Sequence, residues 1–135
     1  MTPIISAEYK GELRTEARHL RSGNTIITDA PPDNNGKGMA FSPTDLVCSA
    51  LGICMMTLMG ILANREGIDM NGMHWEVEKT MTSNPRKIAE VRLAFTHPNL
   101  VATDIQKEKL RRAALTCPVA LSLHDSIKQD VTFNF

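Results

Sequence analysis

The sequence predicts an α+β fold in which antiparallel sheets surround one long central helix. Stretches that alternate between apolar and polar residues, as half-buried strands do, occupy both the beginning and the later part of the chain. Between them, residues 43–63 are apolar on almost every side, which is typical of a helix surrounded by other elements. With 135 residues, 42% hydrophobic and 22% charged, the chain has the composition of a single globular domain, residues 1–135.

The first segment, residues 4–28, predicts two or three antiparallel strands. It alternates loosely, contains a turn signal at 21–24 (RSGN), and ends in the β-branched run TIIT at 25–28. Residues 29–41 are dense in Pro, Gly, Asn and Asp and therefore predict a loop.

The long helix has clear start and stop signals. Ser42 is suited to the N-cap, Pro43 to the first helical position, and Asp45 to the third position of a capping box. Gly67 follows NRE and predicts the end of the helix at residue 65 or 66. Such a helix is about 35 Å long, enough to span a small domain.

A hairpin is predicted after the long helix. Residues 73–83 and 87–97 alternate, with the turn SNPR between them. In the second strand, one face is made of Ala89, Val91, Leu93 and Phe95, and we expect it to pack against the long helix. Ile88 lies on the opposite face by alternation.

Two helices and a strand complete the predicted fold. Residues 103–115 form an amphipathic helix with Thr103 at its cap, and Pro118 opens a second helix over 118–127. Residues 130–135 read as a closing strand. The residues of the first helix expected to point inward are Ile105, Leu110, Ala113 and Ala114.

Composition excludes several classes of function. Lys+Arg and Asp+Glu are both 15 and aromatic residues only 4%, which argues against nucleic acid and anionic membranes as partners. No basic segment precedes an apolar run at the start, and polar residues interrupt the run within 43–63, so a core helix fits better than a signal or membrane span. Three cysteines do not make a disulfide scaffold, and we expect a reducing cytoplasm.

The cysteines are the residues with most chemical promise. Cys117 precedes Pro118, so at a helix cap its thiolate would be stabilised by free N–H groups, although a small residue in a tight turn explains the position equally well. Cys54 lies inside the long helix and reads as a core thiol unless another element supplies a cation or acid–base partner. Cys48 lies six residues earlier, on a face roughly 120° away, so one of these two is core filler.

The other polar residues suggest less. The four histidines form no HExxH pattern and do not pair with cysteine, so we expect neither a metal nor another cofactor. Arginines at 14, 18 and 21 line the early strands, where a solvated strand face is the simpler interpretation.

Two segments together resemble a known family. SPTDLVCSALGIC (42–54) has the form S-P-x-[DE]-L-x₅-G-x-C, and CPVALSL (117–123) has the form C-P-V-x-x-S-L. This pair is similar to the osmotically inducible protein C (OsmC) family, which includes the organic hydroperoxide resistance proteins. The order of predicted elements matches as well. The resemblance implies an OsmC-like fold in an intertwined homodimer with the long helices at its centre.

The resemblance also implies residue roles. By position, Cys54 matches the cysteine that attacks the peroxide, and Cys117 matches the resolving cysteine that closes a disulfide with it. Cys48 falls at a small apolar position of the family and becomes the filler. An external dithiol would then reduce the Cys54–Cys117 disulfide.

This chain departs from the peroxide-reducing branches at one motif position. Those branches have Glu directly after the motif proline, paired with an activating Arg, whereas this chain has Thr44 followed by Asp45. An acid at this later position resembles a less characterised branch of the family, so Asp45 either takes part in activation or only caps the helix. Loop 29–41 contains no arginine, which leaves Arg14 as the candidate activating residue.

The functional prediction that follows is a cytoplasmic, homodimeric, thiol-dependent peroxidase. Its substrates would be organic hydroperoxides, with hydrogen peroxide a further candidate, because an apolar helix would line the pocket. The alternative is a non-catalytic family member that binds a small apolar molecule at the dimer interface, and Thr44 in place of the acid favours it. A cysteine hydrolase ranks third, since no histidine is suitably spaced.

Overall fold

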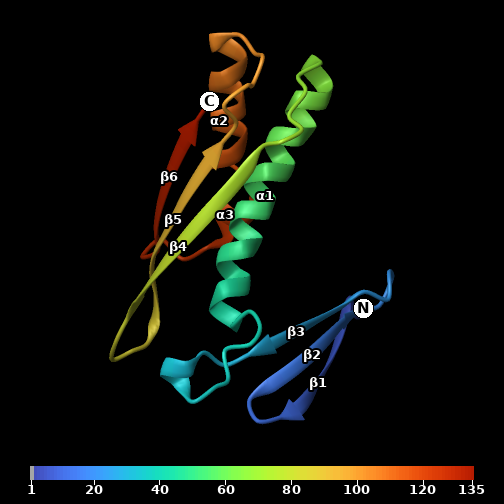
Figure 1. Cartoon of the computed structure of the whole chain (residues 1–135), viewed down its shortest axis with the longest axis vertical. Coiled ribbons are helices and arrows are strands. Elements are labelled where there is room, and N and C mark those ends of the chain that lie inside the picture. Colours follow the sequence, from blue (N-terminus) through green and yellow to red (C-terminus); the bar gives the residue numbers. More distant parts are fainter. Residues whose placement is uncertain (1) are drawn as a thin grey trace. The chain divides into compact units, whose positions relative to one another are not determined.

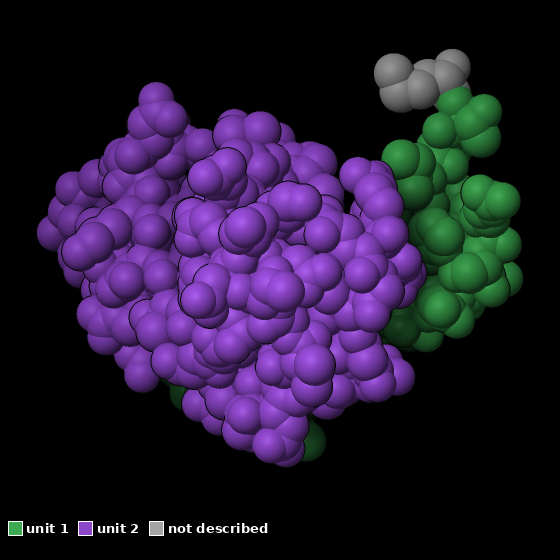
Figure 2. All heavy atoms as spheres, turned by 90° about the horizontal axis from the view of Figure 1, so that it is seen from above, with its two compact units in different colours: residues 1–47 green, residues 48–135 purple. Residues whose placement is uncertain are grey.

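The computed structural model describes residues 2–135 and forms two compact units, residues 1–47 and residues 48–135 (Figure 2). Each unit contains one three-stranded sheet, and the helices of more than one turn lie wholly or largely in the second. The α+β fold predicted from the sequence is confirmed. The expectation of a single domain stays a prediction.

The sheet of the first unit is antiparallel, in the order β1 (Ile5–Gly11), β2 (Arg14–His19) and β3 (Thr25–Asp29) (Figure 1). This confirms the predicted early strands. Glu12 and Leu13 connect β1 to β2 with φ angles of 54° and 64°. Positive φ at both central residues is what a type I′ turn requires, and that turn matches the twist of the strands it joins.

The loop predicted over 29–41 is compact. It contains a single 3₁₀ turn, η1 (Pro32–Asn34), followed by Asn35 in the left-handed region. A Cβ at Gly36 would lie 1.8 Å from the carbonyl oxygen of Ala30, so only glycine fits there. The backbone N–H of Asp29 donates to the carbonyl of Phe41 and closes the loop.

Helix α1 (Pro43–Glu66) has the predicted boundaries, and Gly67 ends it with a φ of 69°. By length and composition alone it could cross a membrane. Its buried residues recur at helical spacing, which is the pattern of a core helix, whereas Ile53 and Ile61 are exposed. The buried residues are Cys48, Leu51, Gly52, Met55, Met59 and Ala63.

At Gly52, helix α1 lies against the second sheet. A Cβ at this position would lie 2.5 Å from ring carbons of Trp75, which is closer than real side chains come. The bare backbone of the helix therefore rests on the indole. Trp75 continues into an aromatic series on the sheet, with Phe95 at 6.3 Å between ring centroids and Phe133 5.7 Å beyond it.

The second sheet is mixed. β4 (His74–Thr82) and β5 (Lys87–Thr96) are antiparallel, as predicted, whereas β6 (Lys128–Asn134) pairs with β5 in parallel. A parallel pair needs a long crossover, and α2 (Asp104–Leu115) with α3 (Pro118–Ser122) supplies it (Figure 1). The all-antiparallel arrangement expected from the sequence is therefore wrong for β6.

A bulge changes the predicted inward face of β5. The register shifts between Thr80, which pairs with Glu90, and Met81, which pairs with Ile88, so Ala89 is the extra residue. The shift returns Ile88 to the buried side, where it joins Val91, Leu93 and Phe95. The expectation that Ile88 faces away from the core is wrong for this reason.

Helix α2 begins with a capping box. Gln106 N–H donates to the Thr103 hydroxyl oxygen at 3.1 Å, and Thr103 N–H donates to the Gln106 amide oxygen at 3.0 Å. Leu110 and Ala114 are fully buried, as predicted, but Ile105 is 72% exposed. Ile105 lies five residues before Leu110, roughly 140° around the helix, which places it on the outer face.

Helix α3 is shorter than predicted. It ends at Ser122, and Leu123 has an extended backbone with φ −76° and ψ 150°. The Ser122 hydroxyl donates to the carbonyl of Pro118 at 2.7 Å. His124 and Ser126 then form a turn in which Ser126 N–H donates to His124 Nδ1, so the predicted helix over 118–127 does not continue.

Candidate functional site

The two cysteines of α1 have different environments. Cys48 is 2% exposed and belongs to the buried stripe of the helix, whereas Cys54 is half-buried. Their separate helical faces were expected from their spacing. Of the three cysteines, Cys54 is the one whose side chain is not buried, so a reagent can reach its sulfur. Such access is the minimum that a reacting cysteine needs.

Cys117 occupies the N-cap of α3, as the sequence predicted. Its N–H donates to the carbonyl of Ala114 at the end of α2, and its backbone is extended, with φ −69° and ψ 153°. Pro118 follows at the first helical position, where its missing N–H costs nothing. The Ala120 N–H donates to the Cys117 sulfur at 3.4 Å. Cys117 is fully buried.

The second unit brings Cys54 and Cys117 into contact. Burial raises the pKa of the Cys117 thiol, the N–H groups of Ala120 and Val119 oppose that rise, and the hydrogen bond and charge of Cys54 add to it. A hydrogen bond that raises a pKa favours the protonated form, so the interaction with Cys54 favours the Cys117 thiol over its thiolate. The helix-cap stabilisation expected at Cys117 is present, but burial outweighs it.

This arrangement gives the two sulfurs different chemical properties. Cys117 is held as a buried thiol, and Cys54 is the sulfur that a reagent can reach. A pair of this kind can pass from two thiols to a disulfide once the accessible sulfur has been oxidised.

Asp45 takes part in the N-terminal cap of α1. Ser42 N–H donates to Asp45 Oδ2 at 3.0 Å, and Asp45 N–H donates to the Ser42 hydroxyl oxygen at 3.1 Å. The Ser42 and Thr44 hydroxyls are 3.2 Å apart. These contacts form the capping box that the sequence predicted.

Arg14 lies on β2 of the first unit and is bound by a residue that the sequence did not single out. Its Nε and Nη2 atoms each donate to a carboxylate oxygen of Asp29 at 2.8 Å. Asp29 is 1% exposed and also accepts the Met39 N–H at 3.1 Å. The hydrogen bond with Arg14 lowers the pKa of Asp29, and the same bond raises the pKa of Arg14.

Cross-strand register was the signal that could have found Asp29. Arg14 on β2 and Asp29 on β3 are direct partners in the antiparallel ladder. An acid that follows the β-branched run TIIT and lies opposite an arginine indicates an ion pair. Finding it requires the pairing of the two strands, which the pattern of each strand alone does not supply.

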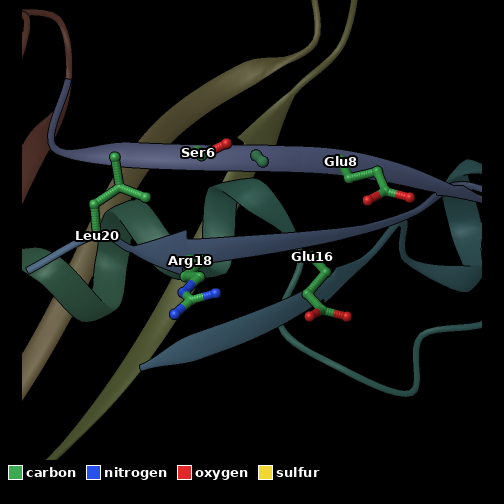
Figure 3. Close-up of a pocket in the computed structure, with 6 residues that line it drawn as sticks. Ser6, Glu8, Glu16, Arg18 and Leu20 are labelled. Carbon is green, nitrogen blue, oxygen red and sulfur yellow. The ribbon is translucent and has the colours of Figure 1, made fainter. Parts of the chain in front are cut away.

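The first unit also has a hollow of its own on the β1–β2 ribbon, which Figure 3 shows with the carboxylates of Glu8 and Glu16 and the guanidinium of Arg18. Glu8 and Glu16 are direct cross-strand partners. Ser6, Ala7 and Leu20 complete its lining. The hollow contains no cysteine and none of the predicted site residues. Over residues 2–135, moreover, no three His, Cys, Asp or Glu side chains gather as a metal site would require.

Comparison with protein families decides the relationship of the chain. The sequence model described as OsmC-like protein matches residues 36–132, most of the chain. The chain belongs to the OsmC-like protein family. The matched range contains both cysteine motifs, SPTDLVCSALGIC and CPVALSL.

Solved structures agree with this assignment to the OsmC-like family. A protein from Psychrobacter arcticus, described as belonging to an osmotic stress induced and detoxification response, is 46% identical with a TM-score of 0.95, over 99% of this chain and 97% of that one. A comparison with curated proteins found no match.

Two more distant structures share the OsmC-like fold. An organic hydroperoxide resistance protein OsmC from Legionella pneumophila is 16% identical with a TM-score of 0.72, over 100% of this chain and 98% of that one. A Vibrio cholerae protein named for organic hydroperoxide resistance has captopril bound in one of its active sites. It is 18% identical with a TM-score of 0.70, over 99% of this chain and 94% of that one.

Of the four site residues expected from the OsmC resemblance, the structure brings two together. Cys54 and Cys117 meet within the second unit. Arg14 belongs to the first unit, where it pairs with Asp29, and Asp45 caps α1. The roles of Arg14 and Asp45 in activating a thiolate stay predictions.

Proposed function

We propose that this OsmC-like protein is a thiol-dependent peroxidase that reduces organic hydroperoxides. The observation that carries the proposal is the contact between a half-buried Cys54 and a fully buried Cys117, whose pKa is raised by burial. The names of the Legionella and Vibrio structures, which refer to organic hydroperoxide resistance, support the same chemistry.

In the first step the Cys54 thiolate attacks the terminal oxygen of the hydroperoxide. The O–O bond breaks, the alkoxide leaves and takes up a proton to become an alcohol, and Cys54 becomes a sulfenic acid. Sulfur is oxidised by two electrons and the peroxide is reduced by two. The proposal favours an alkyl hydroperoxide over hydrogen peroxide because Cys54 is carried by an apolar helix, α1, which would line the pocket.

In the second step Cys117 resolves the sulfenic acid. Its sulfur loses its proton, attacks the Cys54 sulfur and displaces hydroxide, which leaves as water and produces the Cys54–Cys117 disulfide. An external dithiol then reduces that disulfide by two exchange steps and restores both thiols. Two electrons enter from the dithiol for each peroxide reduced.

Arg14 and Asp45 are the proposed activating residues. Arg14, like any arginine, keeps its positive charge at physiological pH, and Asp29 fixes its guanidinium with two hydrogen bonds. Asp45 adds a carboxylate near the position where the peroxide-reducing branches carry Glu. These two assignments come from the family resemblance.

We also propose a cytoplasmic homodimer. Ile53 and Ile61 leave an apolar face of α1 exposed, and burying such a face against a second copy is favourable. Sedimentation equilibrium checks this: a mass near twice the 14.9 kDa of the chain supports the dimer, whereas a monomer contradicts it.

A turnover assay tests the proposed function. Loss of cumene hydroperoxide is followed with dithiothreitol as reductant. Cys54→Ser is expected to abolish turnover, and Cys48→Ala to behave as the unmodified protein. Cys117→Ser is expected to form no Cys54–Cys117 disulfide, so that its turnover depends on direct attack of dithiothreitol on the Cys54 sulfenic acid. Equal activity of Cys54→Ser and the unmodified protein would refute the peroxidase.

The second candidate is a non-catalytic protein that binds a small apolar molecule at the dimer interface. Thr44 favours it, because its hydroxyl is hydrogen-bonded with that of Ser42 and supplies no carboxylate at the motif position. Tight binding of an apolar probe, unchanged in Cys54→Ser, together with no peroxide turnover, would support this candidate.

A further inference from the structure

The short helix α3 is held at its far end by a side chain that belongs to another element. Helix α3 ends at Ser122, so the carbonyl of Ala120 has no helical N–H four residues on. Gln129 of β6 fills that place: its Nε2 donates to the Ala120 carbonyl oxygen at 3.0 Å. Gln129 therefore attaches α3 to the second sheet.

Two hydrogen-bond routes lead from this attachment to Cys117. Ala120 N–H donates to the Cys117 sulfur at 3.4 Å. The peptide group whose carbonyl accepts from Gln129 also contains the N–H of Leu121, which donates to the Cys117 carbonyl at 3.1 Å. Hydrogen bonds linked in series through one peptide group polarise and strengthen one another. Through this peptide group Gln129 acts on the backbone of Cys117, and the residue that it binds, Ala120, also contacts the Cys117 sulfur.

The residue that holds α3 is itself firmly placed. Gln129 pairs in the parallel ladder with Val91, which is fully buried. On the same side of β6, Phe133 stacks on Phe95. A half-buried amide on such a strand has a fixed position. The other end of α3 is fixed by the bond from Cys117 N–H to the Ala114 carbonyl.

We propose that Gln129 is the positioning residue of the resolving cysteine. It holds the N-cap of α3 so that the Cys117 sulfur stays against Cys54, ready to condense with an oxidised Cys54. The idea rests on the proposed function for the identity of the oxidant, but not for the geometry of the thiol pair. Gln129 does not touch the peroxide, so it affects disulfide closure and not sulfenic acid formation.

The first test needs no peroxide. The reduced protein is equilibrated in a series of glutathione redox buffers, and the Cys54–Cys117 disulfide is quantified by alkylation and mass spectrometry. The ratio of closed to open pair gives the effective concentration of the two thiols. Gln129→Met keeps the size of the side chain and removes the donor, and it is expected to lower the effective concentration about tenfold, as loss of orientation does.

Asn134→Leu is the matched control. Asn134 is an amide on the same strand whose Nδ2 donates to the Thr96 hydroxyl and not to α3. This variant is expected to stay within about twofold of the unmodified protein. Gln129→Glu is the second variant: it has the same shape but no donor at neutral pH, and it should reproduce the loss.

The second test uses a single equivalent of cumene hydroperoxide. Gln129→Met is expected to form the Cys54 sulfenic acid, trapped with dimedone, at the unmodified rate and to close the disulfide about tenfold more slowly. Equal slowing of both steps overturns the proposal. Unchanged closure in both Gln129 variants overturns it, and so does failure of both to fold, since Gln129 would then serve stability alone.

The two tests separate this inference from the proposed function. A thiol pair that closes in glutathione but does not react with the peroxide refutes the peroxidase and leaves the role of Gln129 intact. A peroxide that oxidises Cys54 normally in Gln129→Met, with closure also normal, refutes the role of Gln129 and leaves the peroxidase intact.

Discussion

At the level of single residues, Cys117 is subject to opposing influences on its pKa. Burial raises the pKa, the N–H groups at the start of α3 lower it, and Cys54 raises it further. The net rise keeps Cys117 protonated at neutral pH. Because the thiolate is the nucleophile, a protonated Cys117 would not compete with Cys54 for the peroxide in the proposed reaction.

Removing the Cys54 side chain tests this account of Cys117. In Cys54→Ala both the hydrogen bond and the charge contributed by Cys54 are lost, so the pKa of Cys117 is expected to fall relative to the unmodified protein. Titration of the Cys117 ¹³Cβ chemical shift measures it. An unchanged or higher pKa would mean that the two sulfurs do not interact as described.

The same raised pKa has a consequence for stability. The folded chain holds the Cys117 proton more tightly than the unfolded chain, so Cys117 adds to the free energy of unfolding. This stabilisation is fully present below the pKa of the unfolded chain, near 9, and is lost as the pH rises through the higher pKa of the folded chain. Urea unfolding between pH 8 and 10.5 is expected to show a steeper loss for the unmodified protein than for Cys117→Ala. Parallel curves for the two proteins would contradict the shift.

At the level of elements, the start of α1 raises the question of what Asp45 does. If its role is the cap alone, Asp45→Asn keeps an acceptor for the Ser42 N–H and should retain peroxide turnover, while Asp45→Ala should lose about 1 kcal/mol of stability. Urea unfolding and the cumene hydroperoxide assay measure the two quantities. Loss of turnover in a stable Asp45→Asn variant would show that the charge itself takes part in catalysis.

Two glycines of α1 make a matched pair for testing how the helix packs. Gly52→Ala places a methyl group 2.5 Å from Trp75 ring carbons and is expected to destabilise the protein by about 1–3 kcal/mol. At Gly60 the nearest atom is Met70 Cε at 3.9 Å, so Gly60→Ala should stabilise it by about 0.5–1 kcal/mol. Thermal unfolding compares them, and equal effects of the two substitutions would refute the close contact.

Local signals predicted most of the elements, and tertiary contacts account for the errors. The boundaries of α1 follow from Ser42, Pro43 and Gly67, which act within one turn of the chain. The bulge that turns Ile88 inward depends on the pairing of β5 with β4. Because Ile105 is apolar, the sequence predicts that it points inward. The buried face of α2 is instead the one that carries Leu110 and Ala114.

The candidate site was predictable only in part for the same reason. Spacing alone places Cys48 and Cys54 on different faces of the helix but predicts no partner for either. The pairing of Cys54 with Cys117 comes from the family resemblance. Asp29 was missed because its importance depends on strand register. Gln129 was missed because a glutamine in a strand has no special pattern until the strand is placed beside α3.

At the level of the whole molecule, the thiol pair is assembled entirely within the second unit. Helix α1 provides Cys54, the junction of α2 and α3 provides Cys117, and β6 provides the residue that holds that junction. The parallel return of β6 makes this possible, because it brings the chain back beside the sheet after both helices. The contact between the two thiols is therefore a property of the packed unit and should disappear when the protein unfolds.

The most direct test of the account is to map the disulfide after a single oxidation. One equivalent of cumene hydroperoxide is added to the reduced protein, remaining thiols are blocked with iodoacetamide at short times, and peptides are identified by mass spectrometry. The account predicts a Cys54–Cys117 bond that appears within the first sampling times while Cys48 stays fully alkylated under denaturing conditions. Oxidation of Cys48 as fast as Cys54, or no bond between Cys54 and Cys117, would contradict it.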